Sequence, residues 1–149
     1  MIKNIILDVG GILFDDSKNN IEYVLNKNCD LILIKQNLEY IKKLKVMGYK
    51  LYLLTNITED SYNYINKVIN IDTLFDGGIY SYQEHVIKPN STIYNLLIDR
   101  FGLNKEETIF FDDKEKNCIS ANNVGIKSIV FNSIDDIKNN LTSISKANN

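Results

Sequence analysis

The chain has 149 residues, 44% of them hydrophobic, and its 17 Lys and Arg against 19 Asp and Glu give a formal net charge of −2. A chain of this length can bury about two thirds of its unfolded surface in one core, so we expect a single domain over residues 1–149. Because the charge is close to zero, no broad basic field attracts nucleic acid or an anionic membrane, and we expect neither as a partner.

Five short apolar runs bounded by turn residues recur along the chain, and each is too short for a helix. They predict strands at residues 5–9, 50–55, 77–80, 108–111 and 128–131. Between these runs, apolar residues recur three and four positions apart, which is typical of helices. The helical sets are Leu38, Ile41, Leu44 and Met47; Tyr64, Ile65, Val68 and Ile69; and Ile93, Leu96, Leu97 and Arg100.

Strands that alternate with helices of this length pair in parallel through right-handed crossovers and are covered on both faces. The predicted fold class is therefore α/β, a single Rossmann-like three-layer α/β/α domain with a central parallel five-stranded sheet. Gly48 and Gly102 predict helix ends, whereas Thr58 and Pro89 predict helix starts. Residues 132–149 predict a short amphipathic helix followed by a polar tail.

Neither a membrane anchor nor a disulfide is predicted. The longest apolar runs are far shorter than the roughly 20 residues that span a bilayer. The first strand pattern begins close to Met1 and leaves no room for a signal peptide, so we expect a cytoplasmic protein. Cys29 and Cys118 fit no zinc or Cys-x-x-Cys spacing, and we expect two reduced, buried thiols.

Four segments bring polar residues to what we predict is one edge of the sheet. These residues are Asp8, Thr55, Lys88 and the Asp112-Asp113 pair. In an open parallel sheet, ligands bind outside the carboxyl ends of the strands, near the point where the strand order reverses. The sequence therefore predicts a site that gathers these side chains.

The first two segments have a catalytic and a structural interpretation. Asp8 is followed by Gly10 and Gly11, which permit close approach of a phosphate to the backbone, so its carboxylate can attack phosphorus. The alternative is a strand-ending Asp that caps a turn. Thr55 and the backbone N–H of Asn56 can donate to phosphate oxygens. Alternatively, they form an ordinary turn before a helix.

The last two segments supply charge. Lys88 precedes Pro89, which favours an extended backbone before a helix, and its ammonium can neutralise both nucleophile and phosphate. The alternative is a solvated surface lysine. Asp112 and Asp113 are adjacent carboxylates that repel unless a cation or hydrogen-bond donors compensate, and such a pair suits magnesium. The alternative for Asp113 is a helix N-cap.

The four segments together resemble the motifs of the haloacid dehalogenase superfamily over about residues 2–131, nearly the whole chain. The matching residues are Asp8-Val9-Gly10-Gly11, Thr55-Asn56, Lys88-Pro89, and Asp112-Asp113 with Asn117, Ala121 and Gly125. Their order, their position at strand ends and their flanking residues all agree, and this conjunction makes the resemblance specific.

The resemblance implies a phosphatase-type hydrolase that acts on a phosphorylated substrate. Asp8 would be the nucleophile that forms an aspartyl-phosphate, Thr55 and the Asn56 amide would bind the phosphoryl group, and Lys88 would hold the charges together. Magnesium is the implied cofactor. Its implied ligands are Asp8, the Gly10 carbonyl, Asp112 and Asp113.

The sequence departs from the superfamily pattern at Gly10. Phosphatases of the superfamily that this sequence resembles usually carry a second Asp two residues after the nucleophile. This Asp protonates the leaving group and then activates water. Loss of a general acid/base costs about 10²- to 10⁴-fold in rate. Candidates for a substitute are Asp15 and Asp16, which we place on the loop that leaves the site, and His85, whose alternative is a solvated loop residue.

The second departure is the short insertion at residues 17–34, which we interpret as a reduced cap. It is too short for the helical lid of capped members, so we expect a site open to solvent. An open site favours a bulky substrate such as a phosphoprotein or a large phosphoester, or a homo-oligomer whose neighbour covers the site.

Three functions follow in order of preference. The first is a magnesium-dependent phosphomonoester hydrolase, favoured because nucleophile, Thr, Lys and metal carboxylates occur together. The second is a catalytically weak or silent phosphate-binding or regulatory module, favoured by Gly10 and the short insertion. The third is dehalogenation of a small haloacid by Asp8. The paired Asp112 and Asp113 argue against the third, because that reaction needs no magnesium.

Overall fold

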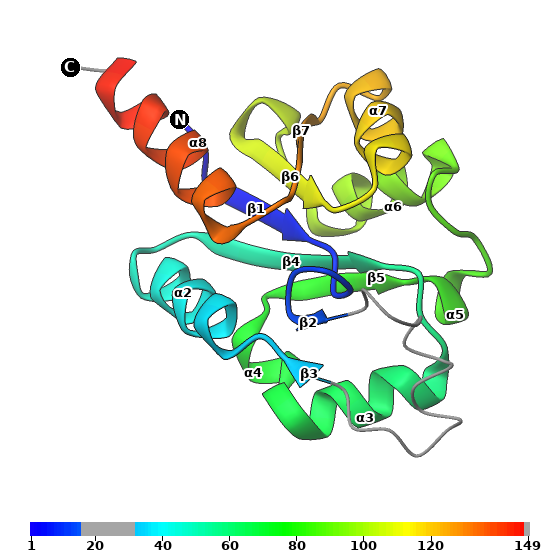
Figure 1. Ribbon diagram of the computed structural model, residues 1–149. Helices are drawn as coiled ribbons and strands as arrows, with labels where there is room; N and C mark the ends of the chain where they lie inside the picture. Colours follow the sequence, from blue (N-terminus) through cyan, green and yellow to red (C-terminus); the bar gives the residue numbers. More distant parts are fainter. Residues whose placement is uncertain (16–31, 148–149) are drawn as a thin grey trace.

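The computed structural model describes residues 1–15 and 32–147, with side chains through residue 142. A five-stranded parallel sheet forms its centre, with the strand order β5-β4-β1-β6-β7 (Figure 1). The strands are β1 (Asn4–Leu7), β4 (Lys50–Thr55), β5 (Gly77–Tyr80), β6 (Thr108–Asp112) and β7 (Lys127–Val130). The five predicted strands are confirmed, with ends that shift by one or two residues.

Helices cover both faces of this sheet, as the α/β prediction requires (Figure 1). They are α2 (Lys35–Val46), α3 (Glu59–Ile69), α4 (Ile71–Leu74), α5 (Ser81–Glu84), α6 (Ser91–Phe101), α7 (Glu115–Asn123) and α8 (Ile134–Ala147), with a 3₁₀ turn η1 (Lys105–Glu107). Buried side chains of α2, α3, α4 and α8 belong to one core cluster. Buried side chains of α6 and α7 belong to the other. The three-layer α/β/α architecture is confirmed.

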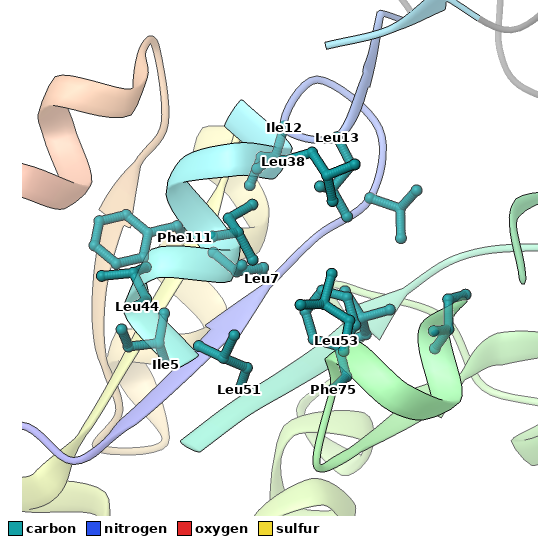
Figure 2. Close-up of a cluster of buried hydrophobic side chains, with 14 of the residues drawn as sticks. Ile5, Leu7, Ile12, Leu13, Leu38, Leu44, Leu51, Leu53, Phe75 and Phe111 are labelled. Atoms are coloured by element: carbon teal, nitrogen blue, oxygen red, sulfur yellow. The ribbon is translucent and has the colours of Figure 1, made fainter. Parts of the chain in front are cut away.

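Alternation along β1 shows how the sheet divides the two cores. Ile5 and Leu7 point into the first cluster, where Figure 2 shows them beside Leu51 and Phe111 of the neighbouring strands. Ile6, between them, belongs to the second cluster. Because both faces are covered, the central strands are buried along their length and read as continuous apolar runs.

The predicted helix boundaries are confirmed at three positions. Thr58 caps α3, since its side chain accepts a hydrogen bond from the backbone N–H of Ser61. Asn90 caps α6, directly after Pro89, and Gly102 ends α6 with a left-handed backbone. The C-terminal helix α8 is longer than the short helix expected and reaches Ala147.

Two predicted core positions are wrong. Met47, expected on the apolar face of α2, is 64% exposed, and Val68, expected on that of α3, is 43% exposed. Met47 lies one residue beyond the end of α2, where the helical period no longer holds, and Val68 stands in the last turn of α3. The apolar pattern therefore extends past the covered part of α2, whereas in α3 Val68 is exposed although the next residue, Ile69, is buried.

A second, small sheet lies outside the predicted alternation. It pairs β2 (Phe14–Asp15) antiparallel with β3 (Ile32–Leu33). Except for residues 32–34, the predicted cap-like insertion at 17–34 lies outside the described residues, as does Cys29. Cys118 is a free, buried thiol, as expected. Within residues 1–15 and 32–147, no helix combines the length and apolar character needed to cross a membrane.

Candidate active site

The carboxyl ends of three adjacent strands bring the predicted residues together. In the parallel registers, Leu7 of β1 pairs with Leu53 of β4 and with Phe111 of β6. Asp8 therefore emerges one residue beyond the end of β1, level with the ends of its two neighbours. The backbone N–H of Asp8 donates to the carbonyl of Phe111 at 3.1 Å. The predicted gathering of Asp8, Thr55 and Asp112 at one edge of the sheet is confirmed.

Lys88 reaches this edge from the loop between α5 and α6. Its Nζ donates to Asp112 Oδ2 at 2.6 Å and to the Leu54 carbonyl at 2.8 Å. It also lies 3.1 Å from Asp8 Oδ1. The side chain is buried, so the interpretation of Lys88 as a solvated surface lysine is wrong. These three oxygens fix the Lys88 ammonium between Asp8 and the carboxyl ends of β4 and β6.

Burial and charge act together on this cluster. Although burial opposes the charged form, the Asp8 and Asp112 carboxylates hold the pKa of Lys88 above its ordinary value. Burial raises the pKa of Asp8, and the Lys88 ammonium offsets part of that rise. Lys88 therefore carries its charge at neutral pH, and the Asp8 carboxylate is more basic than an exposed aspartate.

Asn56 positions Lys88 through its side chain, a contact that sequence reasoning missed. Asn56 Oδ1 accepts from the backbone N–H of Lys88 at 2.8 Å, and its Nδ2 donates to the Lys88 carbonyl at 3.1 Å. This two-point contact joins the end of β4 to the loop that carries Lys88. The sequence suggests only a backbone role for Asn56, as a phosphate donor.

Asp112 is fully buried and both of its carboxylate oxygens accept hydrogen bonds. Oδ1 accepts from the backbone N–H of Lys114 at 2.8 Å, whereas Oδ2 accepts from Lys88 and from Asn117 Nδ2 at 3.0 Å. The backbone of Asn117 is itself held, because its backbone carbonyl accepts a hydrogen bond from the Tyr94 hydroxyl at 2.9 Å. Sequence reasoning gave Asn117 no role in the site. Its spacing of five residues after Asp112, in the first turn of α7, was the available signal.

Three carboxylates form the part of the site that can hold a metal ion. Asp8, Asp112 and Asp113 each offer an oxygen, and these oxygens lie within 4.8 Å of one another. Gly10 lines the cavity beside them. Such an all-oxygen set is the kind that magnesium prefers, with waters and phosphate completing its shell. The residues present therefore fit the predicted ion.

Gly11 gives Asp113 its space. Its φ of +75° lies in the left-handed region, and a Cβ at this position would lie 2.6 Å from Asp113 Oδ2. We expect Gly11→Ala to destabilise the fold by about 1–2 kcal/mol through backbone strain, and also to weaken magnesium binding by displacing the carboxylate. Thermal unfolding and calorimetric titration with magnesium measure the two effects.

Gly48→Ala is the matched control for this change. Gly48 has a φ of +97°, and a Cβ added there would point into open space among the described residues, so alanine adds strain without a clash. Equal magnesium affinity in the two variants would contradict the role assigned to Gly11.

The site opens into a cavity of about 520 Å³. Of the predicted site residues, the cavity is lined by Asp8, Gly10, Thr55, Asn56 and Lys88. The fully buried Asp112 and the partly exposed Asp113 are not among the lining residues. Of the candidates for the missing acid, His85 and Asp15 are exposed and are not among the described lining residues, and Asp16 lies outside the described residues.

Comparison with known proteins agrees with the motif resemblance. The chain matches the haloacid dehalogenase-like hydrolase family over residues 5–131 and belongs to that family. The sesquiterpene phosphatase astK of Aspergillus oryzae is 33% identical over 86 residues, which are 58% of this chain and 44% of that protein. The pyrophosphatase PpaX of Halalkalibacterium halodurans is 27% identical over 92 residues, 62% of this chain and 43% of that protein. The chain thus spans less than half the length of these curated relatives.

A solved structure shares the fold. It is the wild-type HAD family enzyme of Bacteroides thetaiotaomicron in complex with magnesium and inorganic phosphate. The superposition has a TM-score of 0.78 at 20% identity and covers 92% of this chain and 99% of that one.

Proposed function

We propose that the protein is a magnesium-dependent phosphomonoester hydrolase that acts through a phosphorylated Asp8. The observation that carries this proposal is the buried Asp8–Lys88–Asp112 cluster at the bottom of an open cavity. Phosphatases among the relatives and the bound magnesium and phosphate of the structural neighbour support it.

In the first step, an Asp8 carboxylate oxygen attacks phosphorus and the bond from phosphorus to the alcohol oxygen breaks. The alkoxide leaves and takes a proton from solvent. The Thr55 hydroxyl and the Asn56 backbone N–H donate to the phosphoryl oxygens, while Lys88 balances the charge of nucleophile and phosphate. In the second step, water attacks phosphorus and releases Asp8 and inorganic phosphate.

We assign the metal site to Asp8, the Gly10 carbonyl, Asp112 and Asp113. Asp112 also holds Lys88 through Oδ2, while its Oδ1 accepts from one donor and keeps a lone pair for a cation. A magnesium ion bound there would neutralise charge on the phosphoryl group and orient it toward Asp8.

Gly10 favours a second candidate, a phosphate-binding module with little or no turnover. Because residue 10 is glycine, no carboxylate stands at the position where the resemblance leads us to expect the general acid/base. Dehalogenation by Asp8 is less favoured, because that reaction needs no metal ion, whereas Asp8, Asp112 and Asp113 are close enough to hold one.

The direct test is hydrolysis of p-nitrophenyl phosphate with magnesium and with a chelator. We expect turnover that requires magnesium, since this ester has a good leaving group and needs little help from an acid. Phosphate binding without turnover would favour the binding module, and turnover unaffected by the chelator would contradict the metal assignment.

Gly10→Asp tests what the missing carboxylate costs. We expect hydrolysis of an alkyl phosphate to rise about 10²-fold, because a poor leaving group gains most from a general acid, with a smaller gain for p-nitrophenyl phosphate. Gly10→Asn is the matched control of similar size without an acidic proton. An equal rise in both variants, or none in Gly10→Asp, would contradict the acid/base explanation.

A further inference from the structure

The cavity extends well beyond the phosphate-binding residues. Past Thr55 and Lys88, its described wall comes from the start of α3, from α5 and from the loop before Lys88. Three large hydrophobic side chains stand in this wall: Ile57, Tyr82 and Ile87. Ile57 is almost buried, with 6% of its surface exposed, and Tyr82 is partly exposed. Ile87 is 60% exposed, although it directly precedes the buried Lys88. Apolar surface is thus left in water next to the reacting centre.

The hydroxyl groups of this wall are already engaged within the protein. Thr58 Oγ1 donates to Ser61 Oγ at 2.9 Å and accepts from the Ser61 backbone N–H. Ser81 Oγ accepts from the Ile57 N–H at 2.8 Å and donates to the Ile57 carbonyl at 3.1 Å. The Tyr82 hydroxyl accepts from Gln83 Nε2 at 3.1 Å. A polyol in the cavity would exchange its water contacts for few new hydrogen bonds here.

The apolar wall is also held in place. The Tyr82 ring packs against Tyr62, with centroids 5.8 Å apart, and against Tyr80 at 6.4 Å. Ser81 clamps Ile57 through both of its backbone groups. Ile87 is tied to the site because Asn56 holds the backbone of the next residue. The Tyr82 ring and the backbone on either side of the wall are therefore fixed, which leaves little of the wall to be ordered when a ligand binds.

The charged residues of the wall do not select a charged alcohol. Glu59 and Lys114 also line the cavity. Both are exposed and their charges are opposite, so together they add no net charge. They leave the apolar surface as the feature that distinguishes one leaving group from another.

We propose that Ile57, Tyr82 and Ile87 form a subsite for the alcohol part of the substrate, and that this part is apolar, an aromatic ring or a hydrocarbon chain. The proposal rests on the proposed phosphomonoester hydrolysis, whose phosphate site adjoins the subsite. Removal of a hydrocarbon group from water against this wall favours binding roughly in proportion to the apolar area covered.

Binding of non-hydrolysable phosphonates tests the subsite without relying on turnover. Calorimetry with magnesium compares ethylphosphonate, hexylphosphonate and benzylphosphonate on the natural protein. We expect hexyl- or benzylphosphonate to bind about tenfold more tightly than ethylphosphonate, since the wall is open on one side and covers only part of each group. The two larger ligands distinguish a hydrocarbon chain from an aromatic ring.

Substitutions in the wall test whether Ile87 and Tyr82 cause the preference for the larger phosphonates. Ile87→Ser and Tyr82→Ser should each reduce it to about threefold or less, with ethylphosphonate affinity unchanged. Val46→Ser is the control, because Val46 is 89% exposed at the end of α2 and does not line the cavity. Equal affinities for the three phosphonates, or a preference that survives both wall variants, would overturn the subsite.

Hydrolysis of ethyl and hexyl phosphate separates this proposal from the proposed function. Turnover of both esters, with no difference in phosphonate affinity, would overturn the subsite and leave the phosphatase standing. Preferential binding of hexylphosphonate without turnover of either ester or of p-nitrophenyl phosphate would support the subsite and overturn the hydrolytic function.

Discussion

Asp8→Asn is expected to abolish hydrolysis of p-nitrophenyl phosphate, with a loss of about 10⁴-fold or more. The amide keeps the size of the side chain but has no anionic oxygen to attack phosphorus. Because Lys88 retains Asp112 and the Leu54 carbonyl as partners, we expect the variant to fold. Steady-state release of inorganic phosphate with magnesium measures the effect.

Asp135→Asn is the matched control for this substitution. Asp135 is an exposed residue of α8 that pairs with Lys138 on the same helix, far along the chain from the site. We expect its activity to match that of the natural protein. If Asp8→Asn kept activity within about tenfold of natural, a nucleophilic role for Asp8 would be untenable.

Lys88→Met is expected to destabilise the protein by about 3–5 kcal/mol at neutral pH and to remove its activity. The change leaves the buried Asp8 and Asp112 carboxylates without the ammonium that lies within 3.1 Å of both. The deficit should shrink as the pH falls, because burial raises the pKa of Asp8 and its protonation relieves the repulsion. Urea unfolding at several pH values measures it.

Two further variants show whether charge is the cause. Lys3→Met removes an exposed ion pair with Glu107. We expect this substitution to lower the free energy of unfolding by less than about 1 kcal/mol. Combining Lys88→Met with Asp112→Asn should recover part of the stability. If Lys88→Met had the same free energy of unfolding as the natural protein at pH 7, the stability of the cluster would not depend on the ammonium.

Much of this arrangement was predictable because local patterns determine it. The five strands are short apolar runs covered on both faces, and their parallel pairing sends every carboxyl end to the same edge. That is sufficient to place Asp8, Thr55 and Asp112 together. The fold class follows from hydrophobic periodicity and topology, whereas the motif resemblance identified which residues at that edge form the site.

The contacts that set the site's electrostatics were not predictable in the same way. Asn56 binds the backbone of a residue 32 positions away, and Asn117 binds Asp112 across the turn into α7. Both asparagines match the superfamily motifs, but a motif match does not show which groups their side-chain amides contact. The β2–β3 pair was missed because two-residue strands are too short to show a period.

The central claim is that phosphoryl transfer proceeds through Asp8, and trapping the intermediate tests it most directly. Natural protein is mixed with p-nitrophenyl phosphate and magnesium, quenched in acid, and reduced with borohydride, which converts an acyl phosphate to an alcohol. Peptide mass spectrometry then locates the reduced residue. We predict reduction at Asp8 that requires both substrate and magnesium. Continued hydrolysis with Asp8 unmodified, or with reduction at another carboxylate, would contradict the account.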